Sequence, residues 1–382
     1  MLNGKKILFA TGGTGGHINP ALAVAGYIRE NDPKAEILFV GTADRMEAQL
    51  VPAAGYDFKT IEIQGFSREL NFEGLKHNIK TVNLLFKSEG QAKKIIEDFK
   101  PDVVIGFGGY VTASTIPIST SVLSVAARMG IPTAVHEQNA FPGVTNKNLA
   151  KKVDVVMLTA PEAEKLLKPK NPCVVTGLPI RGEIISANKE FARAEMKLDS
   201  RPLILSMGGS LGARAINEAV KYLILHRFEK KDCYYLHATG KAGVSMIDDI
   251  GKDVDLNANP QIMLREYIND MDRCLAAADL VVCRAGASSL SEIQALGKPS
   301  ILVPYPYAAE NHQYYNAKTM SDRDAAILIE EKDFTGERLL SEVEKLLSKP
   351  ERLKKMGENA RAMAILDASQ RITECVCKIV KN

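Results

Sequence analysis

The sequence lacks the charge excess, the cysteine pairs and the leader segment that mark several large classes of protein. The formal net charge of the 382 residues is +3, which is too small to indicate a protein that binds nucleic acid. None of the six cysteines belongs to a Cys-x-x-Cys pair, so neither a zinc site nor a disulfide framework is predicted. No N-terminal stretch has the pattern of a signal peptide, and we therefore expect a reducing, cytosolic compartment.

Charged residues are also absent from 103–127, a stretch that is long enough to span a bilayer. This stretch contains three glycines, one proline and seven serine or threonine residues. A buried strand, a glycine turn and the start of a helix explain that composition better than a membrane span does.

The composition that is present is typical of a soluble protein with a large core. Hydrophobic residues make up 46% of the chain and charged residues 25%, and the length suggests two domains. Apolar runs alternate with helical patterns, which predicts βαβ units and parallel sheets. We expect strands at 6–10, 36–40, 59–63, 102–106, 132–136, 153–158, 173–176, 202–206, 233–237, 279–283, 300–303 and 325–329.

A segment punctuated by Gly and Pro at 176–182 is the best domain boundary, because the pattern of strand, glycine loop and helix restarts after it. We predict an α/β fold of two Rossmann-like, doubly wound domains that face a cleft. The N-terminal domain would cover 1–178 and the C-terminal domain 179–364. A last helix in 365–382 would return to the N-terminal domain.

The most informative motif is Thr-Gly-Gly-Thr-Gly-Gly-His at 11–17, between the first predicted strand and a helical pattern. Its glycines let the backbone approach a ligand closely, and the helix N-terminus favours an anion. His17 adds a titratable base at the exit of the loop. The glycine spacing fits neither the dinucleotide fingerprint nor the P-loop, which requires a lysine where His17 stands.

Other turns carry polar groups after predicted strands. The turn 208–214 offers backbone N–H groups and the hydroxyl of Ser210, which suit a diphosphate, and Arg181 could reach the same anion. The turn 283–292 is made of small residues and ends in Glu292, whose carboxylate can accept two hydrogen bonds from a ribose diol.

Each of these residues also has an ordinary structural explanation. His17 could be a helix cap or a surface residue, and Arg181 a solvated surface arginine. Glu292 could be an acid of a first helical turn, which the helix dipole favours. Glu137 could form a satisfied hydrogen-bonded pair with His136 near the core.

Six motifs occur in order along nearly the whole chain: Gly-Gly-Thr-Gly-Gly-His, Gly-Gly-Tyr, His-Glu-Gln-Asn, Gly-Gly-Ser-x-Gly-Ala-Arg, a Gly-Ala-to-Ser-Glu turn and Gln-x-x-Asn-Ala. With these motifs the chain resembles the MurG family of bacterial peptidoglycan N-acetylglucosaminyltransferases. The resemblance implies a glycosyltransferase B fold, UDP-N-acetylglucosamine as donor and no cofactor. It also implies conversion of undecaprenyl-linked lipid I to lipid II at the inner face of the cell membrane.

The resemblance also assigns roles to individual residues. The donor sugar would be lined by Thr14, Gly15, Gly16, Asn139 and Gln313, and the diphosphate held by Arg181 and Ser210. The uracil would meet the backbone of Ile268, and the phosphate and ribose would meet Ala287, Ser288, Ser289, Leu290, Ser291 and Glu292. The acceptor would meet Gly108, Gly109, Tyr110 and Glu137. The chain departs from the family pattern at Ser288, Ser289 and His312.

The family reaction inverts the anomeric centre, so it needs a base for the acceptor hydroxyl and donors for the leaving diphosphate. We assign His17 as the base, and Ser210, Arg181 and helix N-termini to the leaving group. Three Asp-x-Asp pairs occur, at 253–255, 270–272 and 322–324, but none clearly ends a strand beside a glycine turn. We therefore predict no protein-bound catalytic metal.

A lipid acceptor implies contact with the membrane surface, and 71–88 is the best candidate segment. Four apolar residues fall on one helical face, with basic residues close by, which fits an anionic membrane surface; they are Leu75, Ile79, Val82 and Phe86. An ordinary surface helix would have the same pattern.

Four alternative functions are considered from the residues alone, and the glycine spacing at 11–17 argues against the nicotinamide-dependent one. They are transfer of a UDP-sugar to another lipid such as diacylglycerol, 2-epimerisation of UDP-N-acetylglucosamine, nicotinamide-dependent oxidoreduction and non-catalytic nucleotide binding.

Overall fold

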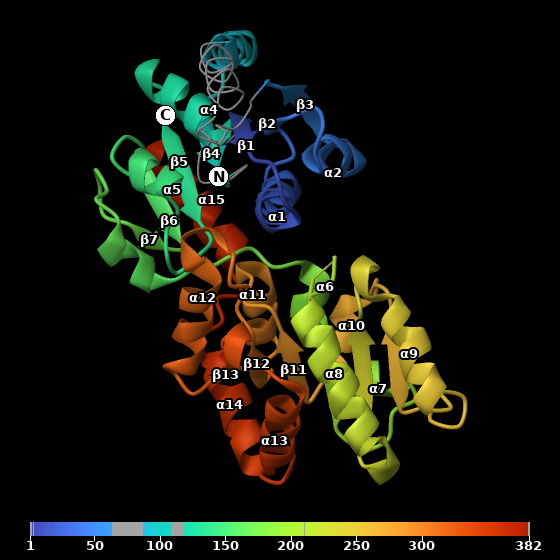
Figure 1. Ribbon diagram of the computed structural model, residues 1–382. Coiled ribbons are helices and arrows are strands. Elements are labelled where there is room, and N and C mark those ends of the chain that lie inside the picture. Colours follow the sequence, from blue (N-terminus) through green and yellow to red (C-terminus); the bar gives the residue numbers. More distant parts are fainter. Residues whose placement is uncertain (1, 3, 63–86, 109–117, 210, 381–382) are drawn as a thin grey trace, which may run out of the picture. The chain divides into compact units, whose positions relative to one another are not determined.

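The computed structural model describes the chain except for residues 1, 3, 63–86, 109–117, 210 and 381–382. It divides into two compact units (Figure 1). Unit 1 comprises Met1–Ile180 and Ile365–Asn382, and unit 2 comprises Arg181–Ala364.

Among the described residues, unit 1 contains one sheet of seven parallel strands in the order β3-β2-β1-β4-β5-β6-β7. Its strands are β1 (Lys6–Ala10), β2 (Glu36–Gly41), β3 (Asp57–Thr60), β4 (Val103–Gly106), β5 (Thr133–Glu137), β6 (Val155–Leu158) and β7 (Val174–Val175). Its helices are α1 (Gly15–Asn31), α2 (Glu47–Ala53), a helix over 87–99, α4 (Ile118–Arg128), α5 (Val144–Leu149), the 3-10 helix η1 (Pro161–Leu166) and α15 (Ala368–Ile379).

The two faces of this sheet follow from the alternation of side chains along each strand. On β1, Ile7 and Phe9 belong to the core cluster that contains residues of α1 and α15. Leu8 and Ala10 belong to the opposite cluster, which contains residues of α4 and of the helix over 87–99. Because both faces are covered, β4 is fully buried and reads as a continuous apolar run.

In the part of unit 2 that the structure describes, six parallel strands form a second sheet in the order β10-β9-β8-β11-β12-β13. The strands are β8 (Leu203–Met207), β9 (Tyr234–Ala238), β10 (Ile262–Arg265), β11 (Leu280–Cys283), β12 (Ser300–Leu302) and β13 (Ala326–Leu328). The α-helices are α6 (Gly182–Ser186), α7 (Lys189–Glu195), α8 (Arg214–Arg227), α9 (Ser245–Asp253), α10 (Met271–Ala277), α11 (Ala287–Ala295), α12 (His312–Ser321), α13 (Gly336–Leu347) and α14 (Pro350–Ala362). Short 3-10 helices lie at η2 (Phe228–Lys230), η3 (Lys241–Gly243), η4 (Ala309–Asn311) and η5 (Glu331–Asp333).

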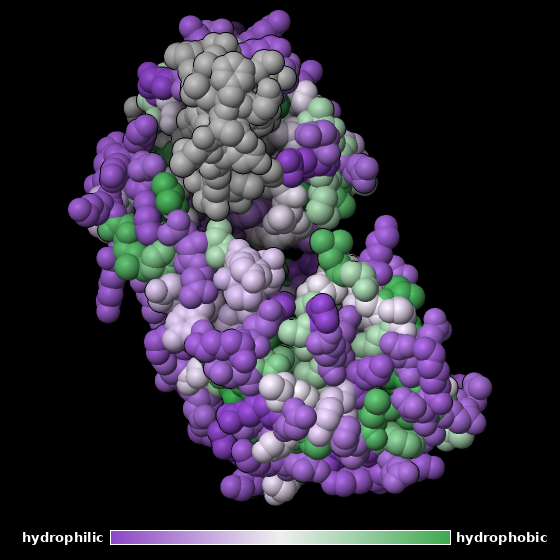
Figure 2. All heavy atoms as spheres, viewed as in Figure 1, coloured by the Kyte–Doolittle hydropathy of each residue, from purple (hydrophilic) through white to green (hydrophobic). Residues whose placement is uncertain are grey.

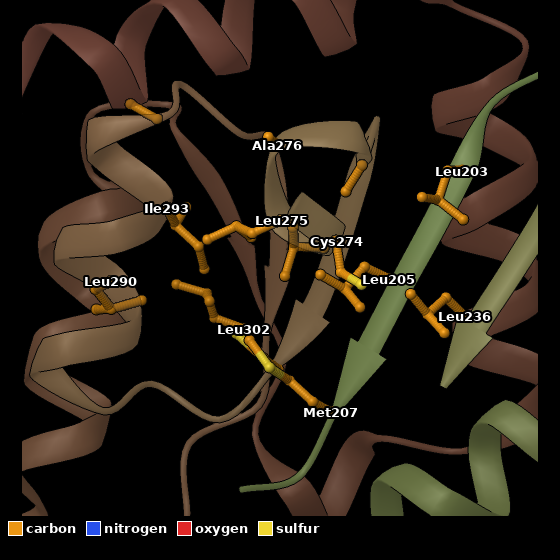
Figure 3. Close-up of a cluster of buried hydrophobic side chains, with 14 of the residues drawn as sticks. Leu203, Leu205, Met207, Leu236, Cys274, Leu275, Ala276, Leu290, Ile293 and Leu302 are labelled. Atoms are coloured by element: carbon orange, nitrogen blue, oxygen red, sulfur yellow. The ribbon is translucent and has the colours of Figure 1, made fainter. Parts of the chain in front are cut away.

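The core of unit 2 is also two-sided. Figure 3 shows one of its layers, in which Leu203 and Leu205 on β8 pack with Leu275 of α10 and Ile293 of α11. Ile204 belongs to the opposite layer, with residues of α8 and α13. The face of the molecule drawn in Figure 2 is largely hydrophilic, with scattered apolar spots, because most of the apolar side chains lie in these layers.

The predicted class, two Rossmann-like α/β units with parallel sheets, is confirmed. Two details of the prediction were wrong. The edge strand β10 was not predicted, and the strand expected at 59–63 begins and ends earlier, as β3. Strand β3 is also an edge strand. Three of its four side chains are exposed and the fourth, Phe58, is half-buried, so no apolar run marks its limits.

The uncharged stretch 103–127 contains β4 at its start and most of α4 at its end. Among the described residues, none of the helices combines the length and the apolar character that crossing a bilayer requires.

Candidate active site

Glycine-containing turns leave both sheets at the strands where the strand order reverses. The order reverses between β1 and β4 in unit 1, and between β8 and β11 in unit 2. Ligands of doubly wound proteins bind outside the carboxyl ends of the strands at such switch points. The predicted site residues therefore form two groups, and each group is described within its own unit.

The first glycine loop joins β1 to α1 (Figure 1). Gly13 has a φ of +91°, a left-handed conformation that glycine adopts without strain. Its N–H donates to Oε2 of the buried Glu47 over 2.9 Å. Because this amide already binds a carboxylate of the protein, it is not a phosphate ligand of the P-loop kind.

His17 lies in the first turn of α1, next to the loop. Its Nδ1 is 3.2 Å from Oγ1 of Thr14, which precedes the helix in an extended conformation. When Nδ1 carries the proton and donates to that hydroxyl oxygen, Nε2 holds a lone pair. A general base needs such a lone pair. Because the Thr14 hydroxyl can both donate and accept, its contact with Nδ1 is compatible with this tautomer and with the other one.

Gly108 follows β4 and faces the ring of His17. A Cβ at position 108 would lie 2.8 Å from His17 Cδ2 and 3.1 Å from His17 Nε2, and the φ of Gly108 is +75°. Both the space and the backbone conformation therefore call for glycine. Of the other residues predicted to meet the acceptor, Gly109 and Tyr110 lie outside the described residues, as do all but the last two residues of 71–88.

Glu137 ends β5 and is buried, with 2% of its surface exposed. Its Oε1 accepts from the backbone N–H and the side-chain amide of Asn139, over 2.9 and 3.2 Å. Its Oε2 accepts from Nδ2 of Asn146 over 2.7 Å. Burial raises the pKa of this carboxyl group, and the hydrogen bonds oppose the rise. Glu137 thus orients Asn139, the residue that the family resemblance assigns to the donor sugar.

His136, by contrast, is a structural residue of the core. It is fully buried, its ring stacks on Phe107, and burial lowers its pKa to about 4. Its Nε2 lies 2.8 Å from the carbonyl oxygen of Gly177, which can only accept, so Nε2 carries the proton of the neutral ring.

The second glycine loop, at 208–212, joins β8 to α8 in unit 2. It packs so closely that a Cβ on Gly208 would lie 2.3 Å from Ala213 N, and one on Gly212 would lie 2.3 Å from the oxygen of Thr239. Gly209 and Gly212 both have positive φ values, of 93° and 86°. Ser210, the predicted diphosphate ligand, lies outside the described residues.

A buried polar network that the sequence did not reveal supports this loop. His237 Nδ1 is 2.8 Å from Ser206 Oγ, and its Nε2 is 3.2 Å from Asn217 Oδ1. Asn217 Nδ2 in turn donates to the oxygen of Thr239, over 2.9 Å, beside Gly212. The three side chains come from β8, α8 and β9, so nothing in the local sequence marks them as a network.

The turn after β11 leads directly into α11, whose first N–H groups have no partner within the helix. Glu292 lies in this helix with 17% of its side chain exposed, and one of its oxygens is 3.2 Å from Arg181 Nη2. Burial raises the pKa of Glu292, and the charge of Arg181 opposes the rise. The structure thus brings together the two residues that were predicted for ribose and diphosphate.

The remaining residues of that turn lie in two environments. Ala287, Ser288 and Ser289 are partly exposed. The side chain of Leu290 packs in the core, and Ser291 is buried. A ligand at this turn would therefore meet the first three residues and Glu292.

Helix α12 carries the Gln-x-x-Asn-Ala motif. Oε1 of Gln313 accepts from the backbone N–H of Tyr305 over 3.0 Å, which turns its amide toward the loop after β12. Asn316 is buried, and its Nδ2 donates to Ala285 O over 3.2 Å, which ties α12 to the turn after β11. Through these two hydrogen bonds the motif holds the loop after β12 and the turn after β11 in place.

Ile268 lies in the connection from β10 to α10 and is buried, so a ligand contact here would use the backbone. The connection is held by Asp270, whose carboxylate accepts from Arg265 Nη1 over 2.8 Å and also binds Arg273. Sequence reasoning considered Asp270 only as part of an Asp-x-Asp pair and missed this role.

The acidic pairs do not gather into a metal site in the described part of the chain. No three His, Cys, Asp or Glu side chains stand together there in an arrangement that could hold a metal ion. Asp270 is paired with arginines, and Asp322 forms an exposed ion pair with Lys318.

Two parallel-sheet α/β units, each with a glycine turn at its switch point, have the architecture of the glycosyltransferase B fold, and the comparisons with known proteins identify the class as glycosyltransferase. Residues 7–158 match the glycosyltransferase family 28 N-terminal domain, and residues 203–372 match the glycosyltransferase family 28 C-terminal domain. A relative from Acetivibrio thermocellus is 44% identical over 99% of both chains. A relative from Caldanaerobacter subterraneus is 43% identical over 97% of this chain and 99% of its own. Both are named UDP-N-acetylglucosamine--N-acetylmuramyl-(pentapeptide) pyrophosphoryl-undecaprenol N-acetylglucosamine transferase.

Among solved structures, MurG of Acinetobacter baumannii is similar, with a TM-score of 0.77 and 28% identity over 98% of this chain and 99% of the other. The chain therefore belongs to the MurG family of glycosyltransferases. A UDP-N-acetylglucosamine 2-epimerase from Neisseria meningitidis has a TM-score of 0.66 at 15% identity, with 98% of this chain and all of the other covered. That likeness shows a shared fold alone.

Proposed function

We propose that this chain is an inverting glycosyltransferase that moves N-acetylglucosamine from UDP-N-acetylglucosamine to lipid I. The acceptor is the 4-hydroxyl of the N-acetylmuramoyl unit on undecaprenyl diphosphate, and the product is lipid II for peptidoglycan synthesis. The observation that carries the proposal is the 44% identity, over 99% of both chains, with a relative that is named for this transfer. The epimerase from Neisseria meningitidis is 15% identical to this chain, which shows the fold alone.

Unit 2 would hold the nucleotide. The first turn of α11 offers N–H groups for the phosphates, and the Glu292 carboxylate suits the ribose diol. Arg181, 3.2 Å from Glu292, brings a positive charge to the same place for the diphosphate. The backbone at Ile268 would meet the uracil, Gln313 the sugar, and Ser210 would add a donor to the diphosphate.

Unit 1 would supply the base. The acceptor hydroxyl oxygen attacks C1 of the donor sugar, the bond from C1 to the diphosphate oxygen breaks, and the hydroxyl proton passes to Nε2 of His17. UDP leaves with the electron pair of the broken bond, and the configuration at C1 is inverted. Thr14 would keep the His17 ring oriented through Nδ1, and Asn139, held by Glu137, would face the sugar. No step needs a cofactor or a protein-bound metal, so activity should survive a chelator of divalent cations.

The protein would work as a peripheral protein at the cytoplasmic face of the cell membrane, where the lipid acceptor is anchored. The apolar and basic residues of 71–88 are the proposed contact with anionic lipid. Leu75→Ser together with Phe86→Ser should reduce binding to anionic vesicles without lowering the thermal midpoint. Loss of folding in this variant would instead mark the segment as an ordinary packed helix.

The transfer is tested by incubating the purified chain with UDP-N-acetylglucosamine and lipid I and following both products. The proposal predicts equal amounts of released UDP and of a lipid heavier by one N-acetylhexosamine. Release of UDP without a change in the lipid would indicate another acceptor. Conversion of the donor to its 2-epimer would indicate the isomerase instead.

A further inference from the structure

Glu47 is a buried carboxylate that no motif singled out, and it joins the loops after two neighbouring strands. It lies in the first turn of α2, and none of its surface is exposed. Oε1 accepts from the backbone N–H of Thr42 over 3.0 Å and from Oγ1 of Thr42 over 2.7 Å. Oε2 accepts from the N–H of Gly13 over 2.9 Å.

The backbone around Glu47 leaves room for its side chain only because residue 41 is a glycine. A Cβ on Gly41, the last residue of β2, would lie 2.6 Å from Cγ of Glu47 and 2.9 Å from the ring of Phe58. Burying a carboxylate is costly unless hydrogen bonds satisfy it, and three donors do so here. Hydrogen bonds from two loops to this one side chain clamp those loops together.

The clamped loop is the one that leads to His17. Gly13 precedes Thr14, whose hydroxyl contacts the His17 ring, and Gly13 has a φ of +91°. If the N–H of Gly13 had no acceptor, the hydrogen bond that holds the Gly13 backbone would be lost, and the neighbouring Thr14 would be free to move. The His17 ring would then move relative to Gly108, against which it packs.

We propose that Glu47 is a positioning residue of the transfer reaction, which fixes the glycine loop and thereby the orientation of His17. The role rests on the function proposed above. It explains why the first glycine loop holds its own carboxylate, whereas a phosphate-binding loop would present that amide to the ligand.

The test is Glu47→Gln, which preserves the size of the side chain. A glutamine can accept through one atom only, so its NH₂ group would face either the N–H of Gly13 or the N–H of Thr42. We expect kcat to fall about 10- to 100-fold, since small misplacements of a reacting group cost up to about that much. The affinity for UDP, measured by calorimetry, should stay within about twofold, because the proposed nucleotide contacts lie in unit 2.

Asp154→Asn is the matched control. Asp154 Oδ2 accepts from the backbone N–H and the hydroxyl of Thr133, over 2.9 and 3.1 Å, as Glu47 does from Thr42. Thr133 begins β5, so this contact lies at the amino end of a strand in the same sheet, away from the glycine loop. The control should lose stability without losing kcat.

A second readout is amide exchange. In Glu47→Gln the exchange of the amides over 13–17 should accelerate, while those over 133–137 stay protected. If Glu47→Gln does not fold, the same measurements are made on Thr42→Val. It removes one of the donors to the carboxylate and should give a smaller loss of kcat with the same preserved affinity for UDP.

The outcomes separate the inference from the function on which it rests. A wild-type rate in Glu47→Gln, or equal losses of kcat in Glu47→Gln and Asp154→Asn, would overturn the positioning role while the transfer function stands. A wild-type protein that binds UDP but transfers nothing would overturn the function. Unchanged exchange over 13–17 in Glu47→Gln would overturn the clamp by itself.

Discussion

The His17 ring packs against the backbone of Gly108, with Cδ2 only 2.8 Å from the place where a Cβ on Gly108 would stand. His17 lies in the first turn of α1, just after the loop that follows β1, and Gly108 lies in the loop after β4; the order of the unit 1 sheet reverses between these two strands. At the switch point of the sheet, the backbone of Gly108 thus limits the movement of the His17 ring on one side.

Gly108→Ala should therefore lower kcat by displacing His17. Gly130→Ala is the matched control, because Gly130 has nearly the same φ, +73° against +75°, and no atom within 4 Å of its Cβ position. Both variants should lose about 1 kcal/mol or more of stability from the strained backbone. Only Gly108→Ala should lose about tenfold or more in kcat. Equal activities in the two variants would show that the packing of His17 does not matter for turnover.

His17→Ala removes the proposed base. We expect kcat to fall by about 10²- to 10⁴-fold, the usual contribution of general acid–base catalysis. Calorimetry should find the affinity for UDP unchanged, since the proposed nucleotide contacts are in unit 2. His226→Ala, on the exposed end of α8, is the control and should be fully active. Near-normal turnover in His17→Ala would show that His17 is not the base, and it would not affect the proposed donor site.

Glu292→Gln tests the proposed ribose contact. Loss of a charged acceptor for two hydroxyls should weaken UDP binding by about tenfold or more. Binding of 2′-deoxy-UDP should change much less, because one of the two hydroxyls is already missing. Glu344→Gln, which alters an ion-paired carboxylate on α13, should change neither affinity. A loss for UDP and 2′-deoxy-UDP in the same proportion would mean that Glu292 acts elsewhere, for instance through its ion pair with Arg181.

His237 should make the stability of unit 2 dependent on pH. Burial lowers its pKa from 6.5 to about 4, so between these values the unfolded chain binds the proton and the folded chain does not. Stability contributed by the neutral ring is therefore complete above pH ~6.5 and is lost as the pH falls toward 4. At about 1.4 kcal/mol for each pKa unit, the loss between pH 7.5 and pH 5 is about 2 kcal/mol.

Urea unfolding of the wild type and of His237→Gln at pH 7.5 and pH 5 measures this effect. Other titrating groups, including His136, are common to both proteins and cancel in the comparison. The glutamine variant should start less stable but lose about 2 kcal/mol less on acidification. The same loss in both proteins would show that His237 does not carry the effect.

Local sequence patterns were sufficient for the class of the fold and for most of its strands, because buried parallel strands are continuous apolar runs. They failed at the edges of the sheets. In β10 the apolar run is only the three residues before Arg265, shorter than the runs of about four to eight residues that predict a buried strand, and only Ile262 is buried. The limits of β3 are set by its pairing with β2, which runs from Leu38 with Asp57 to Gly41 with Thr60. The residues of β3 alone do not show where this pairing begins and ends.

The candidate site shows the same division. The glycine loops, His17 and Glu292 were predicted because each stands in a short motif after a strand. Glu47 was not, because an acid in a first helical turn has the same sequence pattern whether it is solvated or buried against another loop. The network of Ser206, Asn217 and His237 was not predicted either, since its hydrogen bonds join residues that are distant in the chain.

The most direct measurement of the central claim is the initial rate at which radiolabel from UDP-N-acetylglucosamine enters the lipid fraction in the presence of lipid I. We predict label in a single lipid product with the wild-type chain, and at least about a hundredfold less with His17→Ala at equal occupancy of UDP. No label in the lipid fraction, from a wild-type chain that binds UDP normally, would contradict the proposed function.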